Sequence, residues 1–194
     1  MKLHKPLILA SQSPRRQEIL ALAGFEFKVC PAVTEWAPEG LPPCDRVREL
    51  ARSKAEEVAK KYPNSIVLGS DTMVVLGDNA LGKPRDKQDA VNMLMNLQGR
   101  THQVMTGVWI IETNEHGCSV KANGFTDITT VDFWAFSQSE AEEYVATLEP
   151  MDKAGAYAIQ GKGMRFVKSI SGDYFTVMGL PGSRLIRFLK DNFS

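Results

Sequence analysis

Apolar residues near the start of the chain are spaced as in a buried strand followed by a helix. Leu7 to Ala10 form a short apolar run, which is typical of a buried strand. Ser13 fits a helix N-cap, and Pro14 fits the first helical position, where a missing N–H group loses no hydrogen bond. Apolar residues then recur at helical spacing up to Gly24, a residue suited to the left-handed end of a helix.

Two central stretches carry equally clear patterns. Asp45 to Tyr62 has an apolar stripe at helical spacing and predicts the most regular helix of the chain. Ser65 to Leu76 predicts two strands with a short break at Gly69–Thr72, because a carboxylate there interrupts two strongly apolar runs. Gly77-Asp78-Asn79 follows as a hairpin-type turn.

The remaining elements follow from the same two periodicities. We expect strands over Phe25–Val29, Thr101–Glu112 and Phe125–Phe136, a helix capped by Asp86 and ended by Gly99, a helix from the capping box Ser137–Glu140 to a point before Pro150, a hairpin of Phe166–Ile170 with Tyr174–Met178, and a last helix opened by Gly179–Ser183.

Composition limits the classes of protein that fit. A chain of 194 residues with 43% hydrophobic and 24% charged residues suits one soluble globular domain. The formal net charge is zero, which argues against a broad nucleic-acid or membrane surface, so any anion site has to be local. The three cysteines are far apart in the sequence, and no secretory leader or membrane-length apolar run is found. We therefore expect a cytoplasmic protein.

Arg15 and Arg16 occupy the first turn of the first predicted helix, where the helix dipole disfavours cations. An anion would reverse this preference, because free backbone N–H groups, two guanidinium groups and the hydroxyls of Ser11 and Ser13 could all point at it. The alternative is that both arginines lie in solvent. The combination of strand, hydroxyl-rich loop and cationic helix start favours a phosphate site.

Two charged residues follow that each allow two interpretations. Glu35 lies in a proline-rich loop, Pro31–Pro43, where a carboxylate can be functional or can simply face solvent. Lys54 falls inside the apolar stripe of the predicted helix. Such a lysine either extends its ammonium group to the edge of the core or reaches into a polar cleft and meets an anion.

Asp71 lies between two apolar runs, where burying a carboxylate is costly unless it meets a cation or a metal ion. A turn aspartate that bonds its own backbone is the alternative. Lys83, held beside Pro84, should lie near the same edge of the sheet. The small-residue segment from Met151 to Gly163 permits close backbone approach, and its Asp152, Lys153 and Gln160 supply an acceptor, a cation and an amide.

Several of these segments, taken together and in order over nearly the whole chain, resemble the Maf family of nucleoside triphosphate pyrophosphatases. The matching segments are Ser11–Arg16, Glu35, Lys54, Gly69–Thr72, Gly82–Pro84, Asp152–Gly161 and Gly179–Pro181. The segment between Phe27 and Glu35 is slightly shorter than in some relatives. Each segment alone is modest, but the set in register is specific.

The resemblance implies an α/β fold of the Maf/Ham1-like (ITPase-like) type, with a long mixed sheet flanked by helices and a central cleft between two lobes, as a single domain over residues 1–194. It implies hydrolysis of the bond between the α- and β-phosphates of a nucleoside triphosphate, a divalent cation (Mg²⁺ first, Mn²⁺ second) and a cytoplasmic homodimer. A role in the control of septum formation is also implied.

Residue roles follow from the resemblance and from simple chemistry. Asp71 would orient and deprotonate the attacking water, and Asp71 with Glu35 would hold the metal ion through oxygen ligands. The remaining candidates would bind substrate: Ser11, Arg15, Arg16, Lys54, Thr72, Lys83, Lys153 and Gln160.

The substrate expected from these residues is a pyrimidine nucleotide. Family branches differ at the positions of Arg15, Thr72 and Gln160, and this combination is similar to the branch that hydrolyses dTTP and UTP, with modified pyrimidine nucleotides as further candidates. The 7-methyl-GTP branch, with Trp, Gln and Glu at these positions, is one alternative. A nucleotide-sensing regulator of division without catalysis is another, and such a protein would not need the carboxylate pair.

Overall fold

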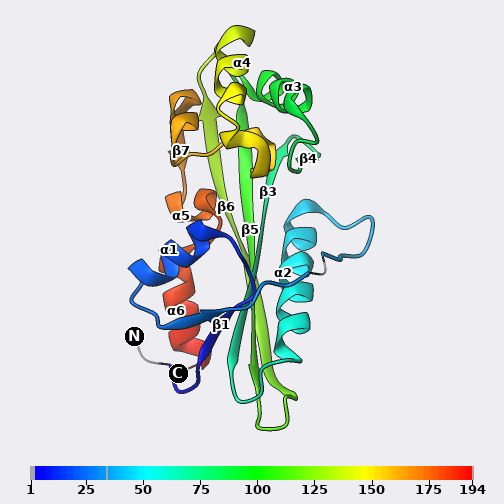
Figure 1. The fold of residues 1–194 in the computed structure, drawn as a ribbon, viewed down its shortest axis with the longest axis vertical. Coiled ribbons are helices and arrows are strands. Elements are labelled where there is room, and N and C mark those ends of the chain that lie inside the picture. The colour runs from blue at the N-terminus through cyan, green and yellow to red at the C-terminus, as the bar shows by residue number, and fades with distance from the viewer. Residues whose placement is uncertain (1–2, 34, 194) are drawn as a thin grey trace. The chain divides into compact units, whose positions relative to one another are not determined.

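The computed structural model describes residues 3–33 and 35–193 (Figure 1), so Thr34 of the predicted loop Pro31–Pro43 lies outside the described residues. The elements in chain order are β1 (Leu7–Leu9), α1 (Pro14–Leu22), β2 (Phe27–Val29), α2 (Pro43–Ala59), β3 (Ile66–Leu76), β4 (Asn79–Leu81), α3 (Lys87–Leu97), β5 (Thr101–Thr113), β6 (Ser119–Phe133), α4 (Gln138–Ala146), η1 (Glu149–Asp152), η2 (Ala154–Ala156), η3 (Lys162–Phe166), β7 (Val167–Ser171), α5 (Tyr174–Met178) and α6 (Gly182–Phe193).

Among the described residues, seven strands form one mixed sheet in the order β2-β1-β3-β5-β6-β7, with β4 paired to β3. Strand β1 runs parallel to both β2 and β3, and Leu7 is in register with Ile66 of β3. The pairs β3–β4 and β6–β7 are antiparallel. The predicted α/β class, a mixed sheet flanked by helices, is therefore confirmed.

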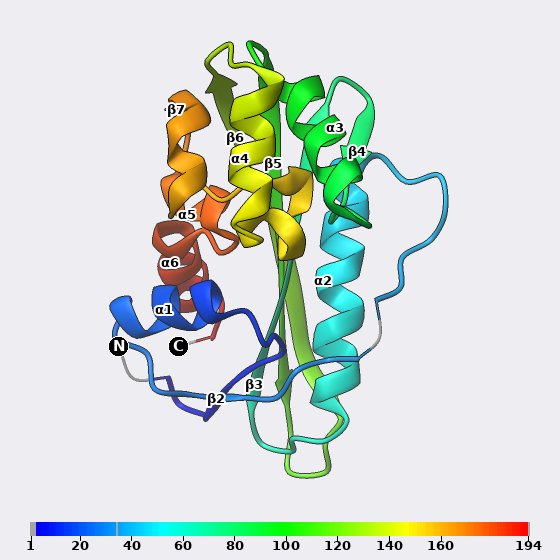
Figure 2. The same ribbon diagram turned by 45° about the horizontal axis from the view of Figure 1, so that its top comes forward.

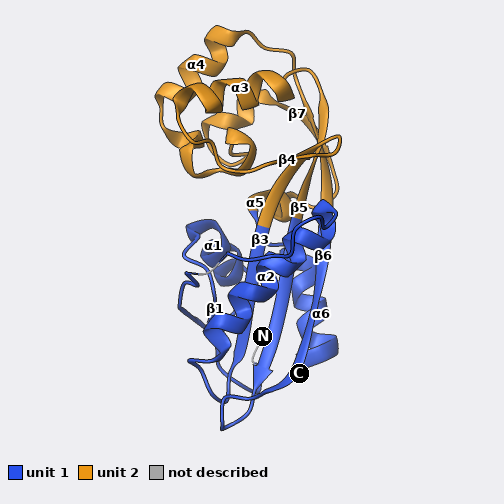
Figure 3. Cartoon of the chain, turned by 90° about the vertical axis from the view of Figure 1, so that its right-hand side faces the viewer, with its two compact units in different colours: residues 1–71, 106–127, 179–194 blue, residues 72–105, 128–178 orange. Residues whose placement is uncertain are grey.

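The chain divides into two compact units (Figure 3). Unit 1 comprises residues 1–71, 106–127 and 179–194, and unit 2 comprises residues 72–105 and 128–178. Strands β3, β5 and β6 each contribute residues to both units. Within the part of the chain that the structure describes, no helix is long and apolar enough to span a membrane.

Helix α2 of unit 1 packs onto the sheet with almost no side chain between them. A Cβ atom on Gly69 of β3 would lie 2.1 Å from the carbonyl oxygen of Ala51, and one on Gly107 of β5 would lie 2.4 Å from that of Val47. Only glycine permits this approach of a strand to a helix backbone. The apolar side of α2 then packs in a core cluster with Ile8 and Val67.

Helices α1 and α6 of unit 1 lie together on the other side of the sheet from α2 (Figure 2). A Cβ on Gly182, at the start of α6, would be 3.1 Å from the Ile19 side chain of α1. The Ser70 side chain of β3 points to this side and donates to the carbonyl of Gly179 at 3.1 Å. Gly69 and Ser70 therefore face opposite helices, as the alternation of side chains along a strand requires.

Unit 2 has its own apolar core, to which α3, α4, the 3-10 segments and the sheet contribute. Its largest fully buried side chains are Tyr144 and Phe166. The Ser137–Glu140 capping box at the start of α4 and the Asp86 cap of α3 are both present, as the sequence predicted.

Four details of the predicted secondary structure are wrong. Strand β3 is continuous from Ile66 to Leu76, because Asp71 meets a cation from α2 and needs no turn to reach water. Tyr174–Met178 is the helix α5, begun by the Asp173 carboxylate, which accepts from the Phe175 amide at 3.1 Å. Strand β6 starts at Ser119 rather than Phe125, and strand β2 starts at Phe27 rather than Phe25.

Candidate functional site

Lys54 of α2 is the centre of a charged cluster in unit 1. Its Nζ lies 2.6 Å from Oδ1 of Asp71, on β3, and 2.9 Å from Oε1 of Glu35, in the loop before α2. The lysine side chain is only 9% exposed and that of Asp71 17%, whereas Glu35 is largely exposed at 65%. One buried ammonium group thus joins a shielded carboxylate to a solvent-facing one.

The burial of Lys54 decides between the two interpretations of its place in the apolar stripe. Its ammonium group does not extend to the edge of the core; it points toward the sheet and meets anionic oxygens. The close packing of α2 on Gly69 makes this possible, because Asp71 lies two residues further along β3 and its side chain leaves the strand on the same face. The geometry follows from a helix–strand pairing that is non-local in sequence.

Arg16, in the first turn of α1, makes a second set of polar contacts in unit 1. Its Nη1 donates to the Ser11 hydroxyl at 2.9 Å, and its Nε donates to the carbonyl of Gly179, also at 2.9 Å. Ser11 is buried and its oxygen also accepts from the Ser13 amide at 3.3 Å. Gly179 thus joins Arg16 to Ser70, so the helix start is fixed to the sheet.

Electrostatic interactions connect Arg16 to the Lys54 cluster. Burial lowers the pKa of Arg16, the Asp71 carboxylate acts in the opposite direction, and the nearby Arg15 lowers this pKa further, while Glu35 raises it. Arg16 thus interacts with Asp71 and Glu35, the same two carboxylates that contact Lys54. The structure therefore brings Ser11, Arg16, Glu35, Lys54 and Asp71 together, with the half-buried Arg15 beside Arg16.

The other predicted site residues belong to unit 2. Thr72 is half-buried in β3, Lys83 is exposed after β4, and Gln160 is exposed between η2 and η3. Lys153 precedes η2 and forms an ion pair with Asp152. The Gly155 amide donates to the carbonyl of Gly82 at 3.0 Å, so the segments that carry Lys153 and Lys83 are joined by a backbone hydrogen bond.

Two residues that the sequence analysis did not single out support the Lys153–Gln160 segment from the core of unit 2. Nε2 of His102, in β5, lies 2.9 Å from the hydroxyl of Tyr157, and both side chains are buried. The His102 ring packs edge-on against Phe133, with ring centroids 4.7 Å apart. Its Nδ1 atom is buried and has no hydrogen-bond partner. Nothing in the local pattern identified His102, because its partners are remote in sequence.

Unit 2 should lose stability in mild acid because of His102. Burial lowers the pKa of this residue to about 4, with Asp132 acting weakly in the other direction, against 6.5 for a free histidine. As the pH falls, the unfolded chain binds a proton at this histidine before the folded chain does. The contribution of neutral His102 to stability is therefore fully present above pH 6.5 and is lost as the pH drops toward 4. The expected loss is about 3 kcal/mol. Urea unfolding at pH 7 and pH 4 measures it.

His102→Gln is the matched variant for this pH effect. It keeps a polar partner for Tyr157 but does not titrate, so its unfolding free energy should change less between the two pH values than that of the wild type. Equal changes in the two proteins would show that His102 is not the group responsible.

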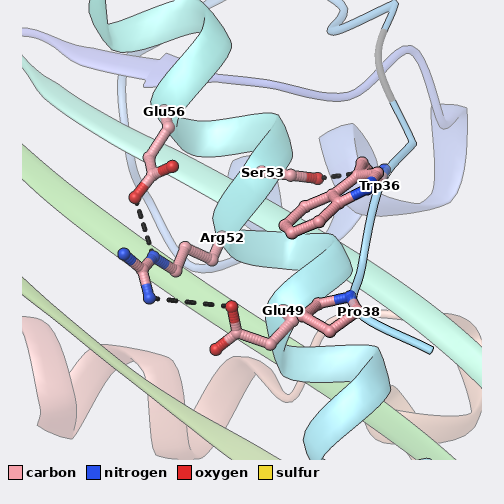
Figure 4. A pocket seen from close by; sticks show the side chains of 6 residues that line it. All are labelled: Trp36, Pro38, Glu49, Arg52, Ser53 and Glu56. Carbon is pink, nitrogen blue, oxygen red and sulfur yellow. Dashed lines mark hydrogen bonds and ion pairs between the residues drawn. The ribbon is translucent and has the colours of Figure 1, made fainter. Parts of the chain in front are cut away.

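A groove of about 320 Å³ lies on the outer side of α2 in unit 1 (Figure 4). It is lined by Trp36, Pro38, Glu49, Arg52, Ser53 and Glu56. Arg52 pairs with Glu56 at 2.7 Å and Glu49 at 3.6 Å, so its charge is already balanced. The Trp36 amide approaches the Ser53 hydroxyl at 3.4 Å, which holds the loop that carries Glu35 along α2.

The donor set of the Lys54 cluster limits the metal ions it could hold. Among the described residues, no three side chains of His, Cys, Asp or Glu gather at one point. Asp71 and Glu35 offer two carboxylates whose oxygens converge on one Nζ atom. Such oxygen ligands suit Mg²⁺, which binds one or two carboxylates when substrate phosphates and water complete its coordination. The residues therefore fit a hard divalent cation.

Comparison with known proteins identifies relatives along almost the whole chain. A family model described as Maf-like protein matches residues 6–192. The chain is 48% identical over 187 residues to a dTTP/UTP pyrophosphatase from Geobacillus sp. (strain WCH70), covering 96% of this chain and 97% of the relative. It is 45% identical over 185 residues to one from Bacillus pumilus (strain SAFR-032), covering 95% of each.

Among solved structures, the Ham1 protein of Staphylococcus aureus is similar at a TM-score of 0.49 and 13% identity, with 96% of this chain and 99% of that chain covered.

Proposed function

The chain belongs to the Maf family, and from this premise we propose that it is a nucleoside triphosphate pyrophosphatase that hydrolyses dTTP and UTP. The products would be the nucleoside monophosphate and pyrophosphate. The observation that carries the proposal is the Lys54 cluster, in which a buried cation holds Asp71 within 2.6 Å while Arg16 lies close enough to interact with the same carboxylate.

The cations of unit 1 suit the binding of a polyphosphate. A neutral protein can hold several negative phosphate charges only by focusing cations in one place. Arg15 and Arg16 lie at the start of α1, where the backbone N–H groups of the helix end add to their positive charge. Lys54 adds a further positive charge. We assign Lys83 and Lys153 of unit 2 to the same substrate on the resemblance to the family.

Asp71 would act as the general base. Its carboxylate takes a proton from the attacking water as the oxygen of that water bonds to phosphorus and the bond between the α- and β-phosphates breaks. Lys54 fixes the position of the carboxylate through the 2.6 Å contact. Arg16, anchored by Ser11 and Gly179, would neutralise charge that develops on the phosphate oxygens.

A divalent cation would bind to Asp71 and Glu35, with Mg²⁺ as the expected ion and Mn²⁺ as the alternative. When bound, it would neutralise phosphate charge and polarise the bond that breaks. Glu35 is 65% exposed, so its carboxylate faces solvent beside Lys54, whereas Asp71 is 17% exposed and held by its burial.

Base recognition would come from Arg15, Thr72 and Gln160. The Gln160 amide can offer both a donor and an acceptor to the edge of a pyrimidine. Modified pyrimidine nucleotides would fit the same contacts, and we extend the proposal to them. The homodimer, the cytoplasmic location and the role in septum formation stay predictions from the resemblance.

Release of pyrophosphate in the presence of Mg²⁺ tests the proposal. A panel of dTTP, UTP, 7-methyl-GTP, ATP and GTP should show the largest kcat/KM for dTTP and UTP. A larger value for 7-methyl-GTP would instead assign the chain to that branch of the family. Binding of nucleotide by calorimetry without any pyrophosphate release would favour a nucleotide sensor and overturn the proposal.

A further inference from the structure

Tyr144 of α4 supports the exposed segment that contains Gln160. The tyrosine side chain is completely buried in the core of unit 2. Its hydroxyl accepts a hydrogen bond from the Ala158 amide at 3.2 Å, two residues before Gln160, and donates to Oε1 of Glu149 at 2.9 Å. A buried hydroxyl thus connects one end of the turn formed by residues 158–163 to a carboxylate.

Glu149 holds the other end of the 158–163 turn. Its carboxylate oxygens accept from the amides of Lys162 and Gly163, each at 3.1 Å. Gly161 has a φ of +124°, and a Cβ there would lie 2.9 Å from both oxygens of the same carboxylate. Backbone hydrogen bonds to Glu149 therefore hold the turn on the C-terminal side of Gln160, and the one to Tyr144 holds it on the N-terminal side.

Glu149 is ionised where it accepts the hydrogen bonds of the turn. Burial alone would raise the pKa of Glu149, but the Lys162 amide, the Tyr144 hydroxyl and the Gly163 amide together outweigh it and lower this pKa below its usual value. Lys153 acts in the same direction. The hydrogen bonds to the turn are therefore made to an ionised carboxylate, and such bonds are stronger than those between neutral groups.

We propose that Tyr144 and Glu149 are positioning residues that fix the backbone on both sides of Gln160 and so determine which nucleobase the Gln160 amide accepts. The inference rests on the proposed function, because it takes Gln160 as the group that reads the base. Neither Tyr144 nor Glu149 touches substrate; each acts through the backbone of the 158–163 turn.

The test compares kcat and KM for UTP and ATP in Tyr144→Phe and Glu149→Gln. We expect the preference for UTP over ATP in kcat/KM to fall about tenfold in each variant, mainly through a higher KM for UTP. A tenfold change corresponds to the loss of about one hydrogen bond, here the one between the displaced Gln160 amide and the base. The kcat for UTP should change little, because the Lys54 cluster is untouched.

Two further variants separate positioning from general destabilisation. Glu142→Gln makes the same chemical change on an exposed residue of α4 that contacts Gln138 at 2.7 Å, and it should keep the wild-type preference. Gly161→Ala alters neither supporting side chain but forces a methyl group against the Glu149 carboxylate, and it should lose the preference.

An unchanged UTP-to-ATP preference in Tyr144→Phe, with only a lower Tm, would overturn the inference and leave the proposed function intact. Tyr144→Phe decides the matter even if Glu149→Gln does not fold, because it removes a single oxygen atom. If the wild type hydrolyses no nucleotide, the proposed function fails. The same variants are then compared by the ratio of Kd values for UTP and ATP, and an unchanged ratio overturns the inference.

Discussion

Asp71→Asn is expected to lower the turnover of UTP by about 10²–10⁴-fold, the contribution typical of a positioned general base. The amide retains the shape of the side chain and an oxygen that can accept from Lys54, so the 2.6 Å contact can persist without the ability to take a proton. Nucleotide binding should remain. Pyrophosphate release and calorimetric titration with UTP measure the two quantities.

Asp127→Asn is a closely matched control for this variant. Asp127 also lies in unit 1, is 19% exposed against 17% for Asp71, and pairs with Arg184 at the same distance of 2.6 Å. Loss of the Asp127 carboxylate should leave the turnover of UTP unchanged. If Asp71→Asn retained wild-type turnover, or lost it only because the protein no longer folds, the role of Asp71 as base would be wrong.

Lys54→Met is expected to reduce both stability and activity. Removing one partner of a buried ion pair leaves an uncompensated charge and costs about 3 kcal/mol, the lower end of the usual range, since Asp71 keeps some contact with water. The two carboxylates that shared the ammonium group would also repel each other, and kcat/KM for UTP should fall about 10²-fold or more. Urea unfolding and pyrophosphate release check the two effects.

Lys5→Met separates these effects. Lys5 is 16% exposed and pairs with Glu112 at 2.6 Å, so its removal should lower stability without lowering turnover. Mg²⁺ should stabilise Lys54→Met more than the wild type, because a divalent cation can replace the lost positive charge between Glu35 and Asp71. If Mg²⁺ stabilised neither protein, the assignment of both carboxylates to a metal ion would be wrong.

Local sequence patterns were sufficient for most helices and strands. The N-terminal strand, Pro14 at the start of α1, and the caps of α3 and α4 each depend on residues within a few positions of one another. The sequence could predict them because the stabilising contacts are themselves local. The family resemblance supplied what local patterns did not, namely the expectation that scattered cations and carboxylates serve one substrate.

One error arose where a tertiary contact overrode a local signal, and another where a local helix cap was overlooked. Asp71 suggested a break in β3, but Lys54, seventeen positions earlier, provides the charge partner that lets the strand continue. The apolar residues of Tyr174–Met178 fitted a strand, yet the Asp173 cap starts a helix there. Glu149 gave no signal at all, because its role depends on amides thirteen and fourteen positions later.

The close contact of α2 with Gly69 and Gly107 constrains how this protein can change. A methyl group at either glycine would force the helix outward, since its Cβ would lie 2.1 or 2.4 Å from a backbone oxygen that no side-chain rotation can move. Lys54 would then be carried away from Asp71. A laboratory selection for well-folded variants should therefore retain glycine at both positions. Because this also keeps Lys54 beside Asp71, the selected variants should be active even though hydrolysis is not screened.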